Sequence, residues 1–283
     1  MAKIIDGKQI SKEVRAEIAA ECEELRAKGI IPGLAVVIVG TDPASQVYVR
    51  NKKKACEEVG FHSEVYELPD STTEAELLTL VERLNDDDNI HGILVQLPLP
   101  KHIDDKIVIE HIDPKKDVDA FHPVNVGRIM IGDYDFLPCT PAGVMVLLEK
   151  SGIDVTGKEC VVLGRSNIVG KPQAMLLLHA NGTVTICHSK TKNLADVTRR
   201  ADILVVAIGR ADFVTGDMVK DGAVVIDVGM NRKADGKLTG DVDFTTVEPK
   251  ASYITPVPGG VGPMTITMLL RNTLTSAKRH NGI

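Results

Sequence analysis

A lysine and a tyrosine on one expected helix form the first candidate site. Tyr48 and Lys52 are four residues apart in segment 44–59, which is expected to be helical, so both project from one face, with Ser45 about one turn earlier. A lysine beside a phenol can act as an acid, a base or an electrostatic stabiliser when burial lowers its pKa. Further basic residues follow Lys52 directly, however, and a lysine in such a run more often faces water.

Gln96 and Asp119 are the next candidates. Gln96 follows the apolar run 92–95 in "GILVQLPLP", a predicted buried strand, and open α/β sheets bind ligands at the carboxyl ends of their strands. Asp119 lies close to Asp117 in the proline-rich segment 98–141, where aspartate commonly forms turns. The residues alone favour a ligand at Gln96 and leave Asp119 open between a turn-forming and a functional interpretation.

A glycine turn after a predicted strand indicates a phosphate site. In "VVLGRSNIVGKP", Gly164 follows a buried apolar run, and Pro172 stands in the expected first turn of a helix, where proline is tolerated. Unpaired backbone N–H groups and the helix dipole favour an anion there. The pattern departs from G-x-G-x-x-G, because Ser166 takes the second position and Gly170 comes one residue late. An ATP-type loop is excluded, since Pro172 follows Lys171 where Ser or Thr would bind Mg²⁺.

The residues after the next predicted strand, 183–187, favour NADP as the dinucleotide. An NAD-specific site places Asp or Glu there, about 20 residues past the turn, to hold the ribose hydroxyls. Segment 188–191 offers His, Ser, Lys and Thr instead. Ser189 and Lys190 suit a 2′-phosphate, and Arg165 could supply a bidentate fork to it. The alternative is that Arg165 and Lys190 are ordinary solvated residues.

The composition is that of a globular protein with small-molecule ligands. The chain has 283 residues, 43% hydrophobic and 25% charged, which indicates a sizeable core. A net charge of −6 and 3% aromatic residues argue against nucleic-acid binding. No apolar run is long enough to span a membrane. Five cysteines without a C-x-x-C pair indicate neither a disulfide framework nor a metal site, and the expected compartment is the cytoplasm.

Strands alternate with helices along the chain, which predicts the α/β class, with two domains and mostly parallel sheets. The proline-rich segment 98–141 shows little periodicity and is the expected end of the first domain. Helices are expected over 11–28, 44–59, 73–85, 141–150 and from about 263 onward, and strands over 34–39, 62–67, 92–95, 160–163, 183–187, 203–207 and 223–227.

Several longer motifs resemble those of the bifunctional methylenetetrahydrofolate dehydrogenase/cyclohydrolase family in its short bacterial form. They are "SQVYVRNK", "HGILVQLPLP", "KDVDAF", "PCTPAG", "GRSNIVGKP", "CHSKT" and "TPVPGGVGPMT", and they extend over nearly the whole chain. The resemblance implies oxidation of 5,10-methylenetetrahydrofolate with NADP⁺ and hydrolysis of the methenyl product to 10-formyltetrahydrofolate, in one-carbon metabolism. A chain with only one of these activities is the narrower alternative.

The resemblance also implies roles for individual residues. Lys52 would be the catalytic lysine, Tyr48 its neighbour over the substrate and Gln96 the amide that orients the lysine. Asp119 would bind the pterin edge, whose adjacent N–H donors suit a bidentate carboxylate. Other substrate contacts would come from Ser45, Pro258, Gly259 and Gly260, and the cofactor contacts from Thr140, Gly164, Arg165, Ser166, Gly170, Ser189 and Ile208.

Domain roles and a homodimer are implied by the same resemblance. Residues 1–140 with the C-terminal helix 264–283 would form a folate-binding catalytic domain, and residues 141–263 a Rossmann-like NADP-binding domain, with a cleft between them near loop 256–265. One departure is Ala120, where the family generally has glycine. Alanine restricts positive φ and close approach of a substrate, so a modest effect on folate affinity is expected.

Two rival functions remain open at the level of sequence. An NADP-dependent dehydrogenase of another substrate, such as a shikimate-type alcohol, would explain the glycine turn and Lys52. It would leave Gln96 and Asp119 without a role. A non-catalytic folate- or nucleotide-binding scaffold is the other rival, and the intact trio of Tyr48, Lys52 and Gln96 argues against it.

Overall fold

The computed structural model describes residues 1–43 and 45–283, and Ala44 only as a position in its helix. The chain divides into two compact units. The three-stranded unit comprises residues 13–139 and 266–283, and the six-stranded unit comprises residues 1–12 and 140–265. Among the described residues, none of the helices combines the length and apolar character that a bilayer span requires.

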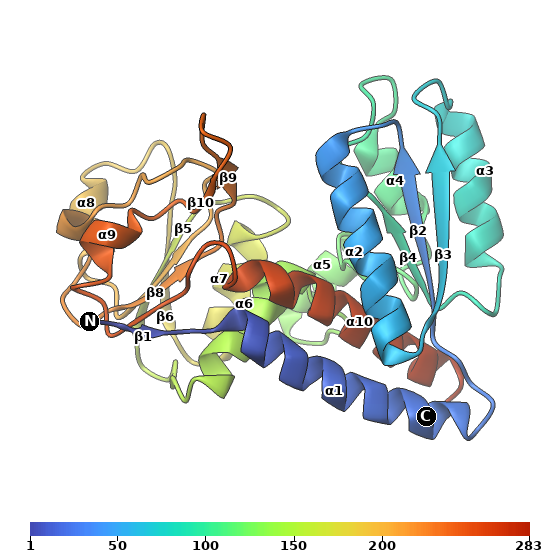
Figure 1. Ribbon diagram of the computed structural model, residues 1–283, viewed down its shortest axis with the longest axis horizontal. Helices are drawn as coiled ribbons and strands as arrows, with labels where there is room; N and C mark the ends of the chain where they lie inside the picture. The colour runs from blue at the N-terminus through green and yellow to red at the C-terminus, as the bar shows by residue number, and fades with distance from the viewer. The chain divides into compact units, whose positions relative to one another are not determined.

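The sheet of the three-stranded unit is entirely parallel, in the order β3-β2-β4. β2 (Gly33–Val39) is central, and all of its residues are buried, as expected of a strand covered on both faces. β3 (His62–Leu68) and β4 (Gly92–Val95) flank it. Figure 1 shows α2 (Pro43–Val59) and α3 (Glu74–Asn85) on either side of this sheet. The crossover from β2 to β3 and the crossover from β3 to β4 run in opposite directions, so two right-handed connections place their helices on opposite faces.

Local sequence signals define both ends of α2, the helix that carries Lys52. The Asp42 carboxylate accepts a hydrogen bond from the Ser45 backbone N–H at 2.8 Å, and Pro43 occupies the first turn. Gly60 ends the helix in the left-handed conformation, with φ of 80°. The position of Lys52 along this helix is therefore set by its own flanking residues.

Two helices lie in the proline-rich segment 98–141, which shows little periodicity and for which no helix was predicted before residue 141. They are α4 (Asp105–His111) and α5 (Pro123–Ile131), and they correct that prediction. Side chains of Asp104 and His122 cap their first turns, and the proline of α5 occupies its first position, where no intrahelical N–H is required. Their 7 and 9 residues are too few for apolar periodicity to stand out.

The sheet of the six-stranded unit is also parallel, in the order β1-β11-β8-β7-β5-β6. β5 has neighbours from later in the chain on both sides, so strand order reverses there, as in doubly wound nucleotide-binding folds. This confirms the expected α/β class and its Rossmann-like second sheet. The strands are β1 (Lys3–Ile4), β5 (Glu159–Leu163), β6 (Thr183–Cys187), β7 (Ile203–Val206), β8 (Val224–Asp227) and β11 (Tyr253–Ile254).

The connections of the six-stranded unit are short helices and one antiparallel hairpin, β9 (Asn231–Arg232) with β10 (Leu238–Thr239). Apolar residues of β5, β7 and β8 pack with the connections into one core, which includes Val161, Leu204 and Val225. The connecting helices are α6 (Cys139–Lys150), α7 (Gly170–His179), α8 (Leu194–Thr198), α9 (Phe244–Val247) and the 3₁₀ helix η1 (Gly216–Met218).

The first residues belong to the six-stranded unit, although the first domain was expected to begin at residue 1. The reason is the two-residue strand β1, which pairs in parallel with β11 through Lys3–Tyr253 and Ile4–Ile254. The unit boundaries fall within the long helices α1 (Gly7–Arg26) and α10 (Val261–His280) and after the first residue of α6. Strands of two residues carry no alternation, so sequence patterning cannot place them.

Candidate functional site

Lys52 and Gln96 meet at the carboxyl edge of the three-stranded sheet. Gln96 directly follows β4, and α2, which carries Lys52, follows the neighbouring strand β2. The Lys52 ammonium donates a hydrogen bond to Gln96 Oε1 at 2.8 Å. The Gln96 amide nitrogen donates in turn to the Leu97 carbonyl at 2.7 Å, which keeps the amide oxygen turned toward the lysine. Parallel strands thus bring together two residues 44 positions apart.

Burial and a nearby carboxylate act on Lys52 in opposite directions. Burial lowers the pKa of Lys52, and the negative charge of Asp119 opposes this shift. Burial raises the pKa of Asp119, and the positive charge of Lys52 opposes that shift. The two groups therefore stabilise each other's charged forms, while burial makes the neutral amine of Lys52 more accessible than it is in water.

Asp117 and Asp119 have different surroundings. The sequence left Asp119 open between a turn-forming and a functional interpretation, and these surroundings distinguish the two aspartates. Asp117 is buried and its Oδ2 accepts bonds from the His122 backbone N–H and the Asn125 amide, each at 2.8 Å. It therefore fixes the turn before α5. Asp119 contacts the Cys139 thiol at 3.6 Å and lies close enough to Lys52 to affect its pKa. Of the two, Asp119 is the carboxylate of the site.

Two residues beside Asp119 were not singled out by the sequence. Cys139 was taken only as a buried thiol, yet its Sγ donates to the Val118 carbonyl at 3.5 Å as well as to Asp119. The Asn272 amide on α10 donates to the same Val118 carbonyl at 2.7 Å. They fix the backbone on which Asp119 stands. The motif "PCTPAG" was the only signal for Cys139, and nothing in the sequence pointed to Asn272.

Ser45 and Tyr48 occupy different environments on α2. The Ser45 hydroxyl is buried and donates to Asp42 Oδ2 at 2.8 Å, so it takes part in the cap of the helix. Tyr48 is 38% exposed and lies one turn before Lys52 on the same helix face. Of these two candidates, Tyr48 is the one presented to solvent.

Ala120 adopts the backbone conformation that glycine favours. Its φ is 56° and its side chain is completely buried. An L-residue in this region is strained, by about 1–2 kcal/mol relative to its ordinary conformations. Alanine was expected to restrict positive φ at this position, yet Ala120 adopts it, at an energetic cost, next to Asp119.

In the six-stranded unit, the turn from β5 to α7 tolerates no side chain at either glycine. Gly164 has a φ of 137°, and an added Cβ would lie 2.2 Å from the Ala207 carbonyl oxygen. At Gly170 an added Cβ would lie 2.3 Å from the Gly164 carbonyl oxygen. The Ser166 hydroxyl accepts bonds from the N–H groups of Val169 and Gly170, both at 3.2 Å. The turn is a backbone cradle at the start of a ten-residue helix, the arrangement that binds phosphates.

A pocket of about 310 Å³ lies at this turn and gathers most of the expected cofactor residues. It is lined by Gly164, Arg165, Ser166, Ser189 and Ile208, which come from the carboxyl ends of three neighbouring strands. The lining also includes His188, Arg210 and Phe213, which the sequence analysis had not assigned to the cofactor. The Arg210 guanidinium lies 4.3 Å from the centre of the Phe213 ring.

Two buried aspartates fix one wall of this pocket. Asp241 accepts bonds from the backbone N–H groups of Ile208, Gly209 and Arg210 at 2.7 to 2.9 Å. Asp227 accepts in turn from the Asp241 N–H at 2.9 Å, and burial raises the pKa of Asp227 to about 6. The signal available in the sequence was the position of Asp227 at the end of a predicted strand.

The remaining expected residues also belong to the six-stranded unit. Thr140 begins the second segment of this unit, and its hydroxyl shares a hydrogen bond of 2.9 Å with the Thr265 hydroxyl. The loop of Pro258, Gly259 and Gly260 is joined to the start of α1 by a bond of 3.2 Å from the Lys8 N–H to the Gly259 carbonyl. Neither Thr140 nor this loop lines the pocket at the glycine turn, and Gly170 supports the turn from behind its lining.

Comparisons with known proteins match both units. Residues 5–119 match the family model for the tetrahydrofolate dehydrogenase/cyclohydrolase catalytic domain, and residues 138–281 match the model for the NAD(P)-binding domain of the same family. A curated relative from Moorella thermoacetica, a bifunctional protein FolD, is 64% identical over 278 residues, which cover 98% of this chain and 99% of the relative.

Solved structures give the same result. The bifunctional enzyme FolD, a methylenetetrahydrofolate dehydrogenase/cyclohydrolase from Campylobacter jejuni, is 53% identical with a TM-score of 0.97 over 99% of both chains. FolD from Trypanosoma brucei, complexed with NADP cofactor and an inhibitor, is 46% identical with a TM-score of 0.94 over 98% of both chains. The chain therefore belongs to the tetrahydrofolate dehydrogenase/cyclohydrolase family.

Proposed function

We propose that this protein oxidises 5,10-methylenetetrahydrofolate with NADP⁺ and hydrolyses the resulting 5,10-methenyltetrahydrofolate to 10-formyltetrahydrofolate. The observation that carries the proposal is the hydrogen bond between Lys52 and Gln96, with Asp119 beside them, at the edge of the sheet where α/β folds bind ligands. Family membership supports both activities and argues against an unrelated shikimate-type dehydrogenase.

The glycine-turn pocket is the proposed NADP site. Its backbone cradle at Gly164 suits the pyrophosphate, and Arg165 with Ser189 suits the 2′-phosphate, because both present donors and no carboxylate from segment 188–191 opposes them. When bound, NADP⁺ supplies the hydride acceptor. The protein's part in this step is to hold the two reactants in register, since the folate nitrogen lone pairs already favour loss of hydride.

Asp119 is the proposed anchor of the pterin ring. A carboxylate can accept two parallel N–H bonds from one edge of such a ring, as it does from a guanidinium. Asp119 is held in place by Cys139 and by the backbone that Asn272 fixes. The proximity of Lys52 favours the ionised form that this contact needs.

Lys52 is the proposed proton carrier of the hydrolytic step. Water adds to the methenyl carbon and loses one proton to the Lys52 amine, and this proton passes to N5 as the C–N5 bond breaks. The second proton of the water leaves to solvent, and the carbonyl of the formyl group forms. Gln96 orients Lys52, and Tyr48 lies beside it over the substrate. The lowered pKa of Lys52 raises the fraction of neutral amine that can accept the proton.

Separate assays of the two steps test this function. Purified protein is mixed with methylenetetrahydrofolate and either NADP⁺ or NAD⁺, and reduced cofactor and the methenyl chromophore are followed separately. We expect reduction with NADP⁺ and little methenyl accumulation. Lys52→Met should slow hydrolysis of added methenyl compound at least about a hundredfold, because general acid–base catalysis usually contributes a factor of this size. Lys53→Met, at the exposed neighbouring position, is the control and should retain it.

Each opposite result would overturn part of the proposal. A Lys52→Met enzyme that hydrolyses the methenyl compound normally would remove Lys52 from the reaction. Absence of cofactor reduction in the wild-type protein would leave a cyclohydrolase alone or a binding scaffold. Turnover with NAD⁺ equal to that with NADP⁺ would contradict the role of Arg165.

We also propose that the protein is a cytoplasmic homodimer. β3 is an outer strand of its sheet, and most of its residues are half-exposed, so its free edge offers backbone groups for pairing with a second copy. The five free, buried cysteines accord with a reducing compartment. Sedimentation equilibrium at micromolar concentration should give twice the mass of 30.5 kDa, and a single mass would contradict the dimer.

A further inference from the structure

A second cavity, of about 440 Å³, lies in the three-stranded unit away from Lys52. It opens beside His91, which precedes β4, whereas Gln96 follows that strand. At about 3.3 Å per residue, the length of β4 separates the two positions by about 17 Å. The cavity is therefore distinct from the proposed folate site. Its volume is in the range that holds small molecules, which begins at about 300 Å³.

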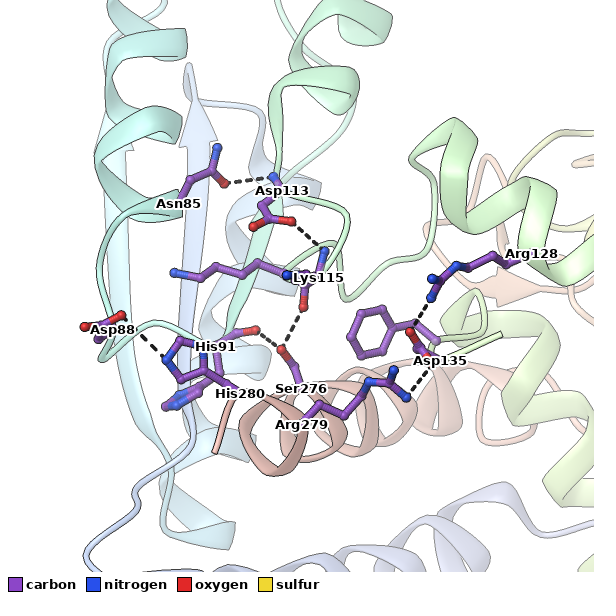
Figure 2. Close-up of a pocket in the computed structure, with 12 residues that line it drawn as sticks. Asn85, Asp88, His91, Asp113, Lys115, Arg128, Asp135, Ser276, Arg279 and His280 are labelled. Carbon is purple, nitrogen blue, oxygen red and sulfur yellow. Dashed lines mark hydrogen bonds and ion pairs between the residues drawn. The ribbon is translucent and has the colours of Figure 1, made fainter. Parts of the chain in front are cut away.

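Two arginines share one carboxylate in the wall of this cavity, as Figure 2 shows. Arg128 of α5 and Arg279 of α10 each donate to a different oxygen of Asp135, both at 2.5 Å. One carboxylate neutralises one guanidinium, so this group has an excess positive charge. Each guanidinium has five N–H donors, and the contact with Asp135 leaves several of them for a ligand.

Lysines add to the positive charge of the same cavity. Lys116 is buried, and its ammonium donates to the carbonyl oxygens of Leu84 and Asp87, at 3.0 and 2.8 Å. These carbonyl groups accept its hydrogen bonds; burial lowers the pKa of Lys116, and the negative charges of Asp113, Asp87, Asp88 and Asp86 oppose that shift. The side chain of Lys115 is exposed at the same cavity.

Acidic residues also line the cavity, and two of them, Asp88 and Asp113, have contacts of their own. Asp113 accepts the backbone N–H of Lys115 at 2.9 Å, and Asp88, whose side chain is 91% exposed, lies 3.6 Å from His280. Ser276 is also engaged, because its hydroxyl donates to the carbonyls of His91 and Lys115. Figure 2 shows these contacts among the residues that line the cavity. The cationic groups of the lining that remain for a ligand are those of Arg128, Arg279 and Lys115.

We propose that this cavity binds a small phosphorylated anion through Arg128, Arg279 and Lys115. Guanidinium groups recognise phosphate oxygens by paired N–H bonds, and an adjacent ammonium contributes as a point charge. Arg128, Arg279 and Lys115 together carry two positive charges in excess of Asp135, which favours a ligand with about two negative charges. The site is independent of the proposed folate and NADP chemistry.

Inorganic pyrophosphate is a suitable probe for the cavity. The titration is followed by NMR at the imidazole signal of His280, which lines the cavity, so that pyrophosphate bound at the glycine turn does not contribute. A His280→Gln sample assigns the signal. We expect saturable binding in the wild-type protein and at least about tenfold weaker binding in Arg279→Gln, since a hydrogen bond to a charged group contributes a factor of this size.

Two further variants make the result decisive. Lys115→Gln should weaken binding as well, and it removes an exposed side chain, so it remains informative if Arg279→Gln does not fold. Arg26→Gln is the matched control: it removes a half-exposed, ion-paired arginine of the same unit outside the cavity, and binding should be unchanged. No saturation at millimolar pyrophosphate, or equal weakening in Arg279→Gln, Lys115→Gln and Arg26→Gln, would overturn the proposal.

Discussion

Lys52 is the residue at which environment matters most for the proposed chemistry. As one of several consecutive basic residues it resembles a surface lysine, and only its burial beside Gln96 gives it a lowered pKa. Gln96 carries no charge, so its amide orients the Lys52 ammonium without adding a negative charge that would raise the pKa of Lys52. The sign of the pKa shift can therefore be tested by changing the charge at position 96.

Gln96→Glu should move the pH dependence of hydrolysis to higher pH. A carboxylate about 3 Å from Lys52 Nζ stabilises the ammonium and raises the pKa of Lys52. Activity that requires the neutral amine then appears only at higher pH. Each unit of pKa reduces the neutral fraction at pH 7 about tenfold, so we expect at least this loss.

The measurement is kcat/KM for the methenyl compound as a function of pH. Gln46→Glu adds the same charge to another face of α2 and serves as the control. A limb of the pH profile that stays in place in Gln96→Glu would show that Lys52 is not the titrating base.

Ala120→Gly should stabilise the protein by about 0.5–1 kcal/mol. Alanine at a φ of 56° is strained, and the relief of this strain exceeds the added entropy of glycine in the unfolded chain. Urea denaturation measures the difference. Ala16→Gly, at an exposed position inside α1, is the control and should destabilise by a similar amount. We expect only a modest change in KM for methylenetetrahydrofolate, and lower stability of Ala120→Gly would contradict the strain.

At the scale of elements, the turn between β5 and α7 depends on a glycine at each of its ends, Gly164 and Gly170. Gly164→Ala places a Cβ 2.2 Å from the Ala207 carbonyl oxygen, so the turn must move. We expect loss of at least about 2 kcal/mol of stability, because backbone strain and a steric clash add together, and at least tenfold weaker NADP⁺ binding.

Gly157→Ala is the matched control for this turn. Gly157 also has a positive φ, 71°, but an added Cβ would meet no atom within 4 Å. It should therefore lose only the conformational part, about 1 kcal/mol, and bind NADP⁺ normally. Denaturation and fluorescence titration with NADPH compare the two variants. Equal cofactor affinity in Gly164→Ala and Gly157→Ala would show that the turn does not form the phosphate cradle.

At the scale of the whole molecule, cofactor binding is linked to unfolding. A ligand present at about a hundred times its Kd stabilises the folded state by about 2.7 kcal/mol. We expect NADP⁺ to raise the unfolding temperature more than NAD⁺ at the same concentration, and Arg165→Gln to remove this difference. Arg232→Gln, an exposed arginine of the same unit, should preserve it. Calorimetry with both cofactors measures the effect, and a difference that survives in Arg165→Gln would remove Arg165 from 2′-phosphate recognition.

The sequence by itself determined the long elements of both units. Continuous apolar runs such as Val36–Val39 and Cys160–Leu163 must be buried on both faces, which requires parallel strands with helical connections, and glycine with capping residues sets the ends of those helices. Helices α4 and α5 were missed because they are short and held by caps, and β1 was missed because a two-residue strand forms only where a partner already stands.

For the candidate site too, the sequence predicted some features and only the tertiary structure decided the others. Local spacing placed Tyr48 with Lys52 on one helix and Gly164 with Gly170 in one turn, because neighbours in sequence are held by local geometry. Which distant groups meet was decided by tertiary structure alone: Lys52 with Gln96, Asp119 with Cys139, and Asp241 with the Ile208–Arg210 backbone. Burial of these pairs, and hence the direction of their pKa shifts, depends on packing from the whole unit, and no single segment of the chain contains that information.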